Sequence, residues 1–224
     1  MAIDENYRWY QQPLSHESGI SGIARDRLQL ANLILPTDLS GKSFLDVGCA
    51  EGAFCLEAAK RGAGKVLGID KKERRISTAR NLANNEDEVP EFIFSNFEEM
   101  AVSDVGQFDY VVCLNVIHHA RNPIKFIEKL AAVVRKRLIL EIAGLDELEA
   151  KASLGVWKYF FAMVPKKMHP AVIVHGTNGG LCLTPKVVTQ ILSESVSARP
   201  FSSIQVRDSY KSRKKTRYLL IADR

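Results

Sequence analysis

The sequence lacks two features that would direct a chain to a membrane or out of the cell. No apolar run is long enough to cross a bilayer. The N-terminal stretch "MAIDENYRWYQQ" has neither a basic start nor an apolar core, so it does not resemble a secretory signal. These absences predict a cytoplasmic protein with no membrane partner.

Closely spaced cysteine pairs of the zinc-binding or redox type are also missing. The four cysteines are scattered through the chain, at Cys49, Cys55, Cys113 and Cys182. We interpret them as small buried residues in a reducing compartment, and we expect no metal site.

Internal repeats, low-complexity tracts and Pro/Gly/Ser-rich linkers are absent too. The hydrophobic and charged fractions, 46% and 25%, are ordinary for a globular protein. We therefore predict a single domain over residues 1–224. Two segments lie outside its repeating pattern, a helical N-terminal extension over 1–40 and an insertion over 144–183 that covers the predicted pocket.

Short apolar runs alternate with amphipathic helical segments from Gly41 onward. The predicted strands are "SFLDVGC", "KVLGID", "EFIFS", "FDYVVCLNV" and "RLILEIA". This alternation predicts an α/β fold, doubly wound, in which helices cover both faces of a mostly parallel sheet. Ligands of such sheets bind at the carboxyl ends of the strands. The last two predicted strands, "SIQVRD" and "TRYLLIAD", are joined by a segment too short for a crossover helix, so we expect an antiparallel hairpin.

The turn after the first predicted strand reads Gly48-Cys49-Ala50-Glu51-Gly52. A dinucleotide would place its pyrophosphate here, but the methyl group of Ala50 would obstruct its approach. The carboxylates of Asp46 and Glu51 would also repel a phosphate. An S-adenosyl group carries no phosphate and has a cationic sulfonium, so the acidic turn favours S-adenosyl-L-methionine.

The stretches "LDVGCAEGAF", "VLGID" and "FDYVVCLNVIHH" together resemble the class I S-adenosylmethionine-dependent methyltransferases. The resemblance extends from Gly41 to about Ala143, and the C-terminal hairpin fits the usual sheet of that family. It implies a Rossmann-like sheet of seven strands and a methyltransferase activity. At Ala50 the family most often has glycine, and we expect a locally tighter loop that still binds the cofactor.

The resemblance also implies roles for residues around the first turn. Asp46 matches an acidic residue that acts near the methionine ammonium group, and Gly48 and Gly52 let the backbone pass under the cofactor. Asp70 matches the acid that accepts hydrogen bonds from both ribose hydroxyls. Asp46 and Asp70 also have a purely structural interpretation, as caps of the turns or helices that follow them.

Three further residues receive roles at the ends of the third and fourth predicted strands. Asn96 stands where a residue bonds the adenine amino group, with Phe97 beside the ring, although the family usually has aspartate at that position. Asn96 is alternatively a turn residue. Asn115 would face the methionine part and the incoming substrate.

His118 and His119 follow the fourth predicted strand on the rim of the sheet. An imidazole suits a general base for an acceptor that holds its proton tightly. The alternative is that one or both only pack against the turn or bond a backbone carbonyl.

The sequence says less about the methyl acceptor than about the cofactor. We expect methyl transfer to an oxygen or nitrogen atom of a small-molecule or sugar-like acceptor. RNA is the alternative partner, because the basic stretch 207–217 could attract it. The stretches "YRWYQQ" and "AAKRGAGKVLGIDKKERRISTAR" also show a local resemblance to enzymes that methylate or carboxymethylate the tRNA wobble uridine. A solvated hairpin turn is the other interpretation of 207–217. A non-catalytic adenosylmethionine-binding module and a dehydrogenase also remain open.

Overall fold

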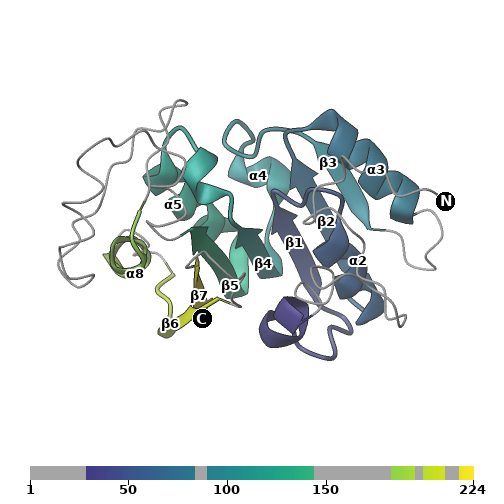
Figure 1. Cartoon of the computed structure of the whole chain (residues 1–224). Coiled ribbons are helices and arrows are strands. Elements are labelled where there is room, and N and C mark those ends of the chain that lie inside the picture. The colour runs from purple at the N-terminus through teal and green to yellow at the C-terminus, as the bar shows by residue number, and fades with distance from the viewer. Residues whose placement is uncertain (1–28, 84–89, 144–182, 195–198, 210–216) are drawn as a thin grey trace. The chain divides into compact units, whose positions relative to one another are not determined.

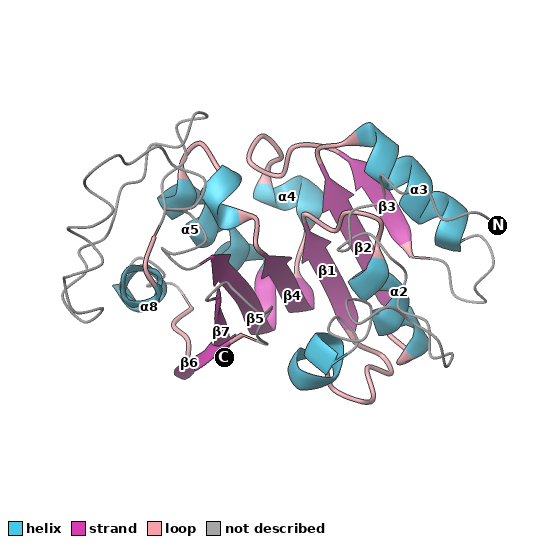
Figure 2. Cartoon of the chain, viewed as in Figure 1, coloured by secondary structure: helices cyan, strands magenta, loops and turns pink. Residues whose placement is uncertain are grey.

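The computed structural model describes residues 29–83, 90–143, 183–194, 199–209 and 217–224. The strands are β1 (Ser43–Val47), β2 (Lys65–Asp70), β3 (Glu91–Phe94), β4 (Phe108–Leu114), β5 (Val134–Ala143), β6 (Ser203–Asp208) and β7 (Arg217–Asp223). The helices are α2 (Ala53–Lys60), α3 (Glu73–Ala83), α4 (Val102–Val105), the 3₁₀ turn η2 (Ile117–His119), α5 (Pro123–Val133) and α8 (Pro185–Glu194) (Figures 1 and 2).

The seven strands form one sheet in the order β3-β2-β1-β4-β5-β7-β6. Strands β1, β2, β3 and β4 pair in parallel, whereas β7 runs antiparallel to both β5 and β6. This arrangement confirms the predicted α/β class, the mostly parallel sheet and the C-terminal hairpin. The tertiary contacts divide the chain into a first unit, Met1–Val112, and a second unit, Cys113–Arg224.

In the first unit, the carboxyl ends of neighbouring strands are brought into register. Val47 of β1 lies opposite Ile69 of β2, and Asp70 lies opposite Phe94 of β3. Helix α2 packs on β1 and β2, and α3 packs on β2 and β3. The buried face of α2 carries Ala58 and Ala59, whose small side chains let the helix approach the sheet closely.

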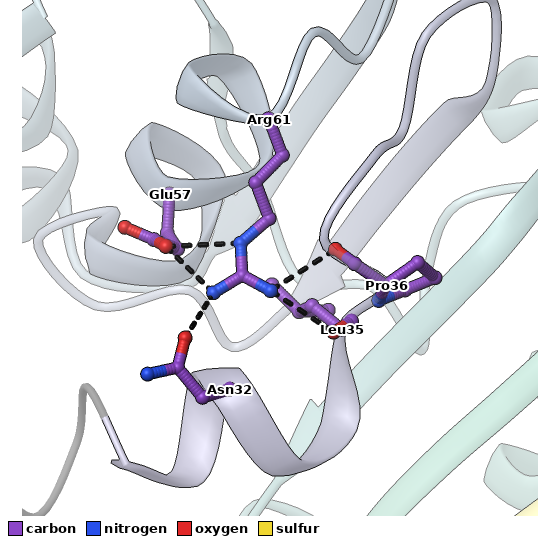
Figure 3. A network of polar contacts seen from close by, with 5 residues as sticks. All are labelled: Asn32, Leu35, Pro36, Glu57 and Arg61. Atoms are coloured by element: carbon purple, nitrogen blue, oxygen red, sulfur yellow. Dashed lines mark hydrogen bonds and ion pairs between the residues drawn. The ribbon is translucent and has the colours of Figure 1, made fainter.

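A polar network joins the helical residues 29–34 to α2 (Figure 3). The guanidinium group of Arg61 donates to the carbonyl oxygens of Leu35 and Pro36 at 2.9 and 3.0 Å. It also donates to Asn32 Oδ1 at 2.6 Å and to Glu57 Oε1 at 2.7 Å. One side chain therefore satisfies carbonyls at the end of the helical segment and anchors that segment to α2.

In the second unit, α5 begins at Asn122 and Pro123, residue types that suit a helix cap and a first turn. Asn122 Oδ1 accepts a hydrogen bond from the backbone N–H of Lys125 at 3.1 Å, and Pro123 occupies the first turn. Helix α5 packs on β5 and α8, and α8 also contacts β7. The C-terminal Arg224 donates to the carbonyl oxygens of Ala131 and Val134, which ties the chain end to the α5–β5 junction.

Several predictions fall outside the described residues. They include most of the N-terminal extension, nearly all of the insertion 144–183, and residues 210–216 of the basic stretch. Of the extension, residues 29–34 are helical. Within the described part of the chain, no helix has the length and apolar character needed to cross a membrane.

Candidate functional site

The turn between β1 and α2 is fixed by hydrogen bonds to the end of β2. The backbone N–H groups of Gly48 and Cys49 both donate to the carbonyl oxygen of Ile69, at 2.7 and 3.1 Å. Ala50 has φ +51°, a left-handed conformation that costs a non-glycine residue about 1 kcal/mol. Its N–H donates to Asp70 Oδ2 at 3.1 Å, which helps to hold this strained residue in place.

Gly52 meets two structural demands at once. It has φ +80°, and a β-carbon at this position would lie 2.6 Å from ring atoms of Phe92 and 3.3 Å from the β-carbon of Ala79. Any larger residue would therefore force the turn away from the aromatic ring of β3. The role of Gly52 beneath a cofactor remains a prediction, but packing against Phe92 already requires glycine here.

Asp70 ends β2 and is only 5% exposed. Its Oδ1 accepts the N–H of Lys72 at 2.9 Å, and its Oδ2 accepts the N–H of Ala50 and lies 3.4 Å from a guanidinium nitrogen of Arg75. The carboxylate thus organises the turn that leads into α3, which begins at Glu73, and its alternative role as the cap of that helix remains a prediction. Each carboxylate oxygen accepts about two hydrogen bonds, so Oδ1 retains capacity for one further donor.

Three of the buried carboxylates of the first unit, Asp46, Glu51 and Asp70, lie in or beside the turn and give it a negative character. This negative charge affects the pKa of the Cys49 thiol. A hydrogen bond with Cys55 lowers that pKa, but burial and the charges of Asp46 and Asp70 raise it above its ordinary value. Burial disfavours any charge here, but the negative charges of Asp46 and Asp70 would favour a cationic ligand over a thiolate.

The Cys55 thiol shows the same effect more strongly. Burial, the hydrogen bond with Cys49 and the charge of Asp46 raise its pKa well above the ordinary value. Cys49 and Cys55 are therefore protonated, unreactive thiols. Their burial agrees with the interpretation of the sequence, and no group of three metal-ligating side chains occurs among the described residues.

Asn96 lies two residues beyond the end of β3, beside the end of β2. The N–H of Ser95 donates to the backbone carbonyl of Asp70 at 3.1 Å. The side chain of Asn96 takes part in the turn that follows, through contacts with Glu98 and Glu99. The turn interpretation is thus confirmed, and the adenine contact remains a prediction. The neighbouring Phe97 is buried, 4% exposed.

The second unit contains the other predicted residues. Asn115 has φ +59°, and its N–H donates to the carbonyl oxygen of Glu141 at 2.9 Å. Its side-chain oxygen is buried and accepts no hydrogen bond from any described residue. The rings of His118 and His119 lie in η2 with their centroids 4.0 Å apart and tilted by 47°. The roles of all three residues remain predictions.

Sequence reasoning missed a buried ionic cluster in the second unit. Glu141 of β5 is 4% exposed and accepts hydrogen bonds from Ser209 Oγ and from Arg217 at 3.0 Å. The one signal was a single glutamate inside the apolar run "RLILEIA". A charge in a buried strand requires a partner, but the sequence does not say which one.

Comparisons with known proteins now identify the class. A family described as a methyltransferase domain matches residues 38–172, more than half of the 224 residues. The chain belongs to this methyltransferase-domain family. The class I resemblance seen in the sequence is confirmed, and with it the use of S-adenosyl-L-methionine as the cofactor.

Relatives and solved structures agree with that placement. The chain is 36% identical over 137 residues to a ubiquinone biosynthesis O-methyltransferase of Neisseria meningitidis, a match that covers 59% of this chain and 57% of the relative. It is 34% identical over 152 residues to an O-antigen chain terminator bifunctional methyltransferase/kinase of Escherichia coli, covering 62% of this chain and 21% of that protein. The chain thus matches little more than half the length of the first of these relatives.

The fold is shared with magnesium protoporphyrin IX methyltransferase of Synechocystis with bound adenosylhomocysteine. The TM-score is 0.63 at 21% identity, over 93% of this chain and 89% of the other. A mycolic acid cyclopropane synthase with the same bound molecule gives a TM-score of 0.63 at 12% identity, over 91% and 86% of the two chains. At these identities the likeness concerns the fold alone.

Proposed function

We propose that this chain transfers the methyl group of S-adenosyl-L-methionine to an oxygen or nitrogen atom of a small-molecule or sugar-like acceptor. The observation that carries the proposal is the buried carboxylate of Asp70 at the end of β2, tied to the β1 turn through the N–H of Ala50. It offers an anionic acceptor for ribose hydroxyls beside a turn that favours a cation. Both relatives are named as methyltransferases, and the one from Neisseria meningitidis is named as an O-methyltransferase. These names favour oxygen as the acceptor atom.

The proposed reaction is an in-line displacement at the methyl carbon. A lone pair of the acceptor oxygen or nitrogen forms the new bond to carbon while the carbon–sulfur bond breaks, and its electron pair remains on sulfur. The products are the methylated acceptor and adenosylhomocysteine. Because the leaving group is already activated, the protein contributes mainly by holding the nucleophile in line.

The proton of the acceptor must leave during or before this step. We propose His118 or His119 as the base that receives it, since both lie in η2 directly after β4. Converting both to alanine should lower kcat at least about a hundredfold, the usual worth of general-base catalysis, with little change in cofactor affinity. Unchanged turnover in the double variant would rule out this assignment.

Binding of the cofactor product tests the ribose role directly. Asp70→Asn replaces a charged acceptor by a neutral one, and hydrogen bonds to charged groups are worth about 1.5–3 kcal/mol, so affinity for adenosylhomocysteine should fall at least about tenfold by calorimetry. Asp104→Asn on the exposed face of α4 is the matched control, because it makes the same change away from the turn. Equal affinities in the two variants would contradict the ribose role.

Transfer of a labelled methyl group then distinguishes the acceptor classes. The full chain is incubated with labelled cofactor and separate pools of phenols, sugars and tRNA, at low and high salt. Label in a small acceptor that is insensitive to salt supports the proposal. Label in RNA that falls steeply with salt supports the RNA alternative, and binding of adenosylhomocysteine without any transfer supports a non-catalytic module.

A further inference from the structure

We infer that Glu99 is a positioning residue that fixes the orientation of the Asn96 amide and thereby makes the site selective for a 6-amino purine over a 6-oxo purine. Asn96 Nδ2 donates to Glu99 Oε1 at 2.8 Å. Asn96 Oδ1 accepts the backbone N–H of Glu98 at 3.2 Å. The inference rests on the proposed contact between Asn96 and the adenine of the cofactor.

The contacts with Glu98 and Glu99 determine which side of the Asn96 amide carries the oxygen and which carries the nitrogen. Turning the Asn96 amide by half a rotation would place its NH₂ group against the N–H of Glu98. The same turn would place its carbonyl oxygen against the carboxylate of Glu99. Both exchanges replace a hydrogen bond by a repulsion, so the amide has one favoured orientation. The Glu99 contact is the stronger determinant, because its acceptor is charged and the bond is shorter.

A fixed amide has a consequence for the nucleobase. An amide carbonyl has two acceptor positions, and the N–H of Glu98 occupies one of those on Asn96 Oδ1. The second can accept an exocyclic amino group of a purine. Glu99 directs one of the two Nδ2 hydrogens, and the amide orientation that it fixes presents the acceptor Oδ1 to the base, where a 6-oxo group would need a donor.

The position of Asn96 in the sheet fits this task. Strands β2 and β3 are parallel neighbours, with Asp70 opposite Phe94 at their carboxyl ends. The N–H of Ser95 holds the start of the following turn to the carbonyl of Asp70. A nucleoside whose ribose contacts Asp70 therefore has its base near the turn that carries Asn96.

The test compares two ligands that differ at purine position 6 and, as a consequence, at N1, which carries a proton only in the 6-oxo form; replacing Glu99 reports on position 6 because its contact is with Asn96. Calorimetry measures the affinity of the full chain for adenosylhomocysteine and for its hypoxanthine analogue, S-inosylhomocysteine. The wild-type chain should prefer the adenine form, and Glu99→Ala should lower that preference about three- to tenfold, the worth of one hydrogen bond. Glu98→Ala is the matched control, because it removes a neighbouring carboxylate and leaves the Asn96–Glu99 contact intact.

Each outcome bears on the inference. An unchanged preference in Glu99→Ala overturns it, even where the affinity for both ligands falls, because a merely structural role weakens both equally. An equal loss of preference in Glu98→Ala also overturns it, because charge alone would then be the cause. If the wild-type chain binds adenosylhomocysteine but shows no preference, this inference fails while the cofactor assignment stands; absence of any binding overturns both.

A second variant tests the contact from the other side. Asn96→Asp would place a carboxylate against Glu99 at hydrogen-bond distance, so like charges would meet. We expect it to weaken adenosylhomocysteine binding at least about threefold in the wild-type background. The loss should shrink when Glu99→Gln is also present, because glutamine donates to the new carboxylate. An equal loss in both backgrounds contradicts the proposed pairing.

Discussion

The two units hold the ends of their strands by different kinds of contact. In the first unit, backbone N–H groups join the turn after β1 to Ile69 and Asp70, about 20 residues further along the chain. In the second unit, the end of β5 depends on a buried ionic cluster in which Glu141 contacts residues 68 and 76 positions away. The first arrangement follows from two neighbouring parallel strands, whereas the second requires the C-terminal hairpin to be in place.

The difference explains why a nucleoside site can be recognised from a short stretch of sequence. The geometry of the turn depends on local features: a strand end, left-handed residues at Gly48, Ala50 and Gly52, and an acid at the end of the next strand. The end of β5 instead brings the side chain of Glu141 together with side chains from both sides of the distant C-terminal hairpin, Ser209 and Arg217. The residues at the end of β5 can therefore change only in matched sets, and we expect single substitutions there to be costly.

The largest expected effect follows from breaking that cluster. Glu141→Leu should destabilise the chain by about 4 kcal/mol in urea unfolding, because it leaves Arg217, 14% exposed, without its carboxylate. The double variant Glu141→Leu/Arg217→Leu should recover part of this loss, since an apolar pair replaces a largely buried charge that has lost its ion pair with Glu141. A double variant no more stable than the single one would show that the ionic contact is not what organises the end of β5.

The next largest effect concerns the packing of the turn in the first unit. Gly52→Ala should cost about 3 kcal/mol, because it adds a left-handed strain of about 1 kcal/mol to a 2.6 Å contact with Phe92. Gly41→Ala is the control, since Gly41 also has a positive φ, +66°, and nothing lies within 4 Å of an added β-carbon. It should lose only about 1 kcal/mol. Equal losses would mean that backbone strain alone, and not Phe92, makes glycine necessary at position 52.

The sequence was sufficient wherever a feature depends on neighbours in the chain. The alternation of apolar runs and helices predicts the parallel strands, and the short connection predicts the β6–β7 hairpin. Asn122 and Pro123 predict the start of α5, because caps are local. The acidic turn and Asp70 were identified by the same kind of local pattern, although their contacts with a ligand stay predictions.

Side-chain contacts between residues that are far apart in the sequence, or that belong to no recognisable motif, were not predictable. Arg61 contacts Asn32 across 29 residues, and nothing in the sequence distinguishes it from any other surface arginine. Glu99 is three residues from Asn96, yet a glutamate in an acidic pair has many uses, so only the observed contact reveals its role. Gly52 was expected for cofactor approach, and the demand imposed by Phe92 depends on a β3 side chain forty residues later.

The smallest expected effect refines the description of the first unit. Arg75 lies 3.4 Å from Asp70 Oδ2, which already accepts the N–H of Ala50. Two ribose hydroxyls bound to Asp70 would need one acceptor position on each oxygen, so the guanidinium group must withdraw from Oδ2 as they bind. Arg75→Gln removes this competition, and because the nitrogen–oxygen distance of 3.4 Å is long for a hydrogen-bonded ion pair, the contact is weak. We expect adenosylhomocysteine to bind up to about threefold more tightly, with the advantage shrinking at high salt as screening weakens the wild-type pair. A loss of affinity in Arg75→Gln would instead show that Arg75 supports the carboxylate during binding, and that side-chain contacts help to hold the first unit's site as well.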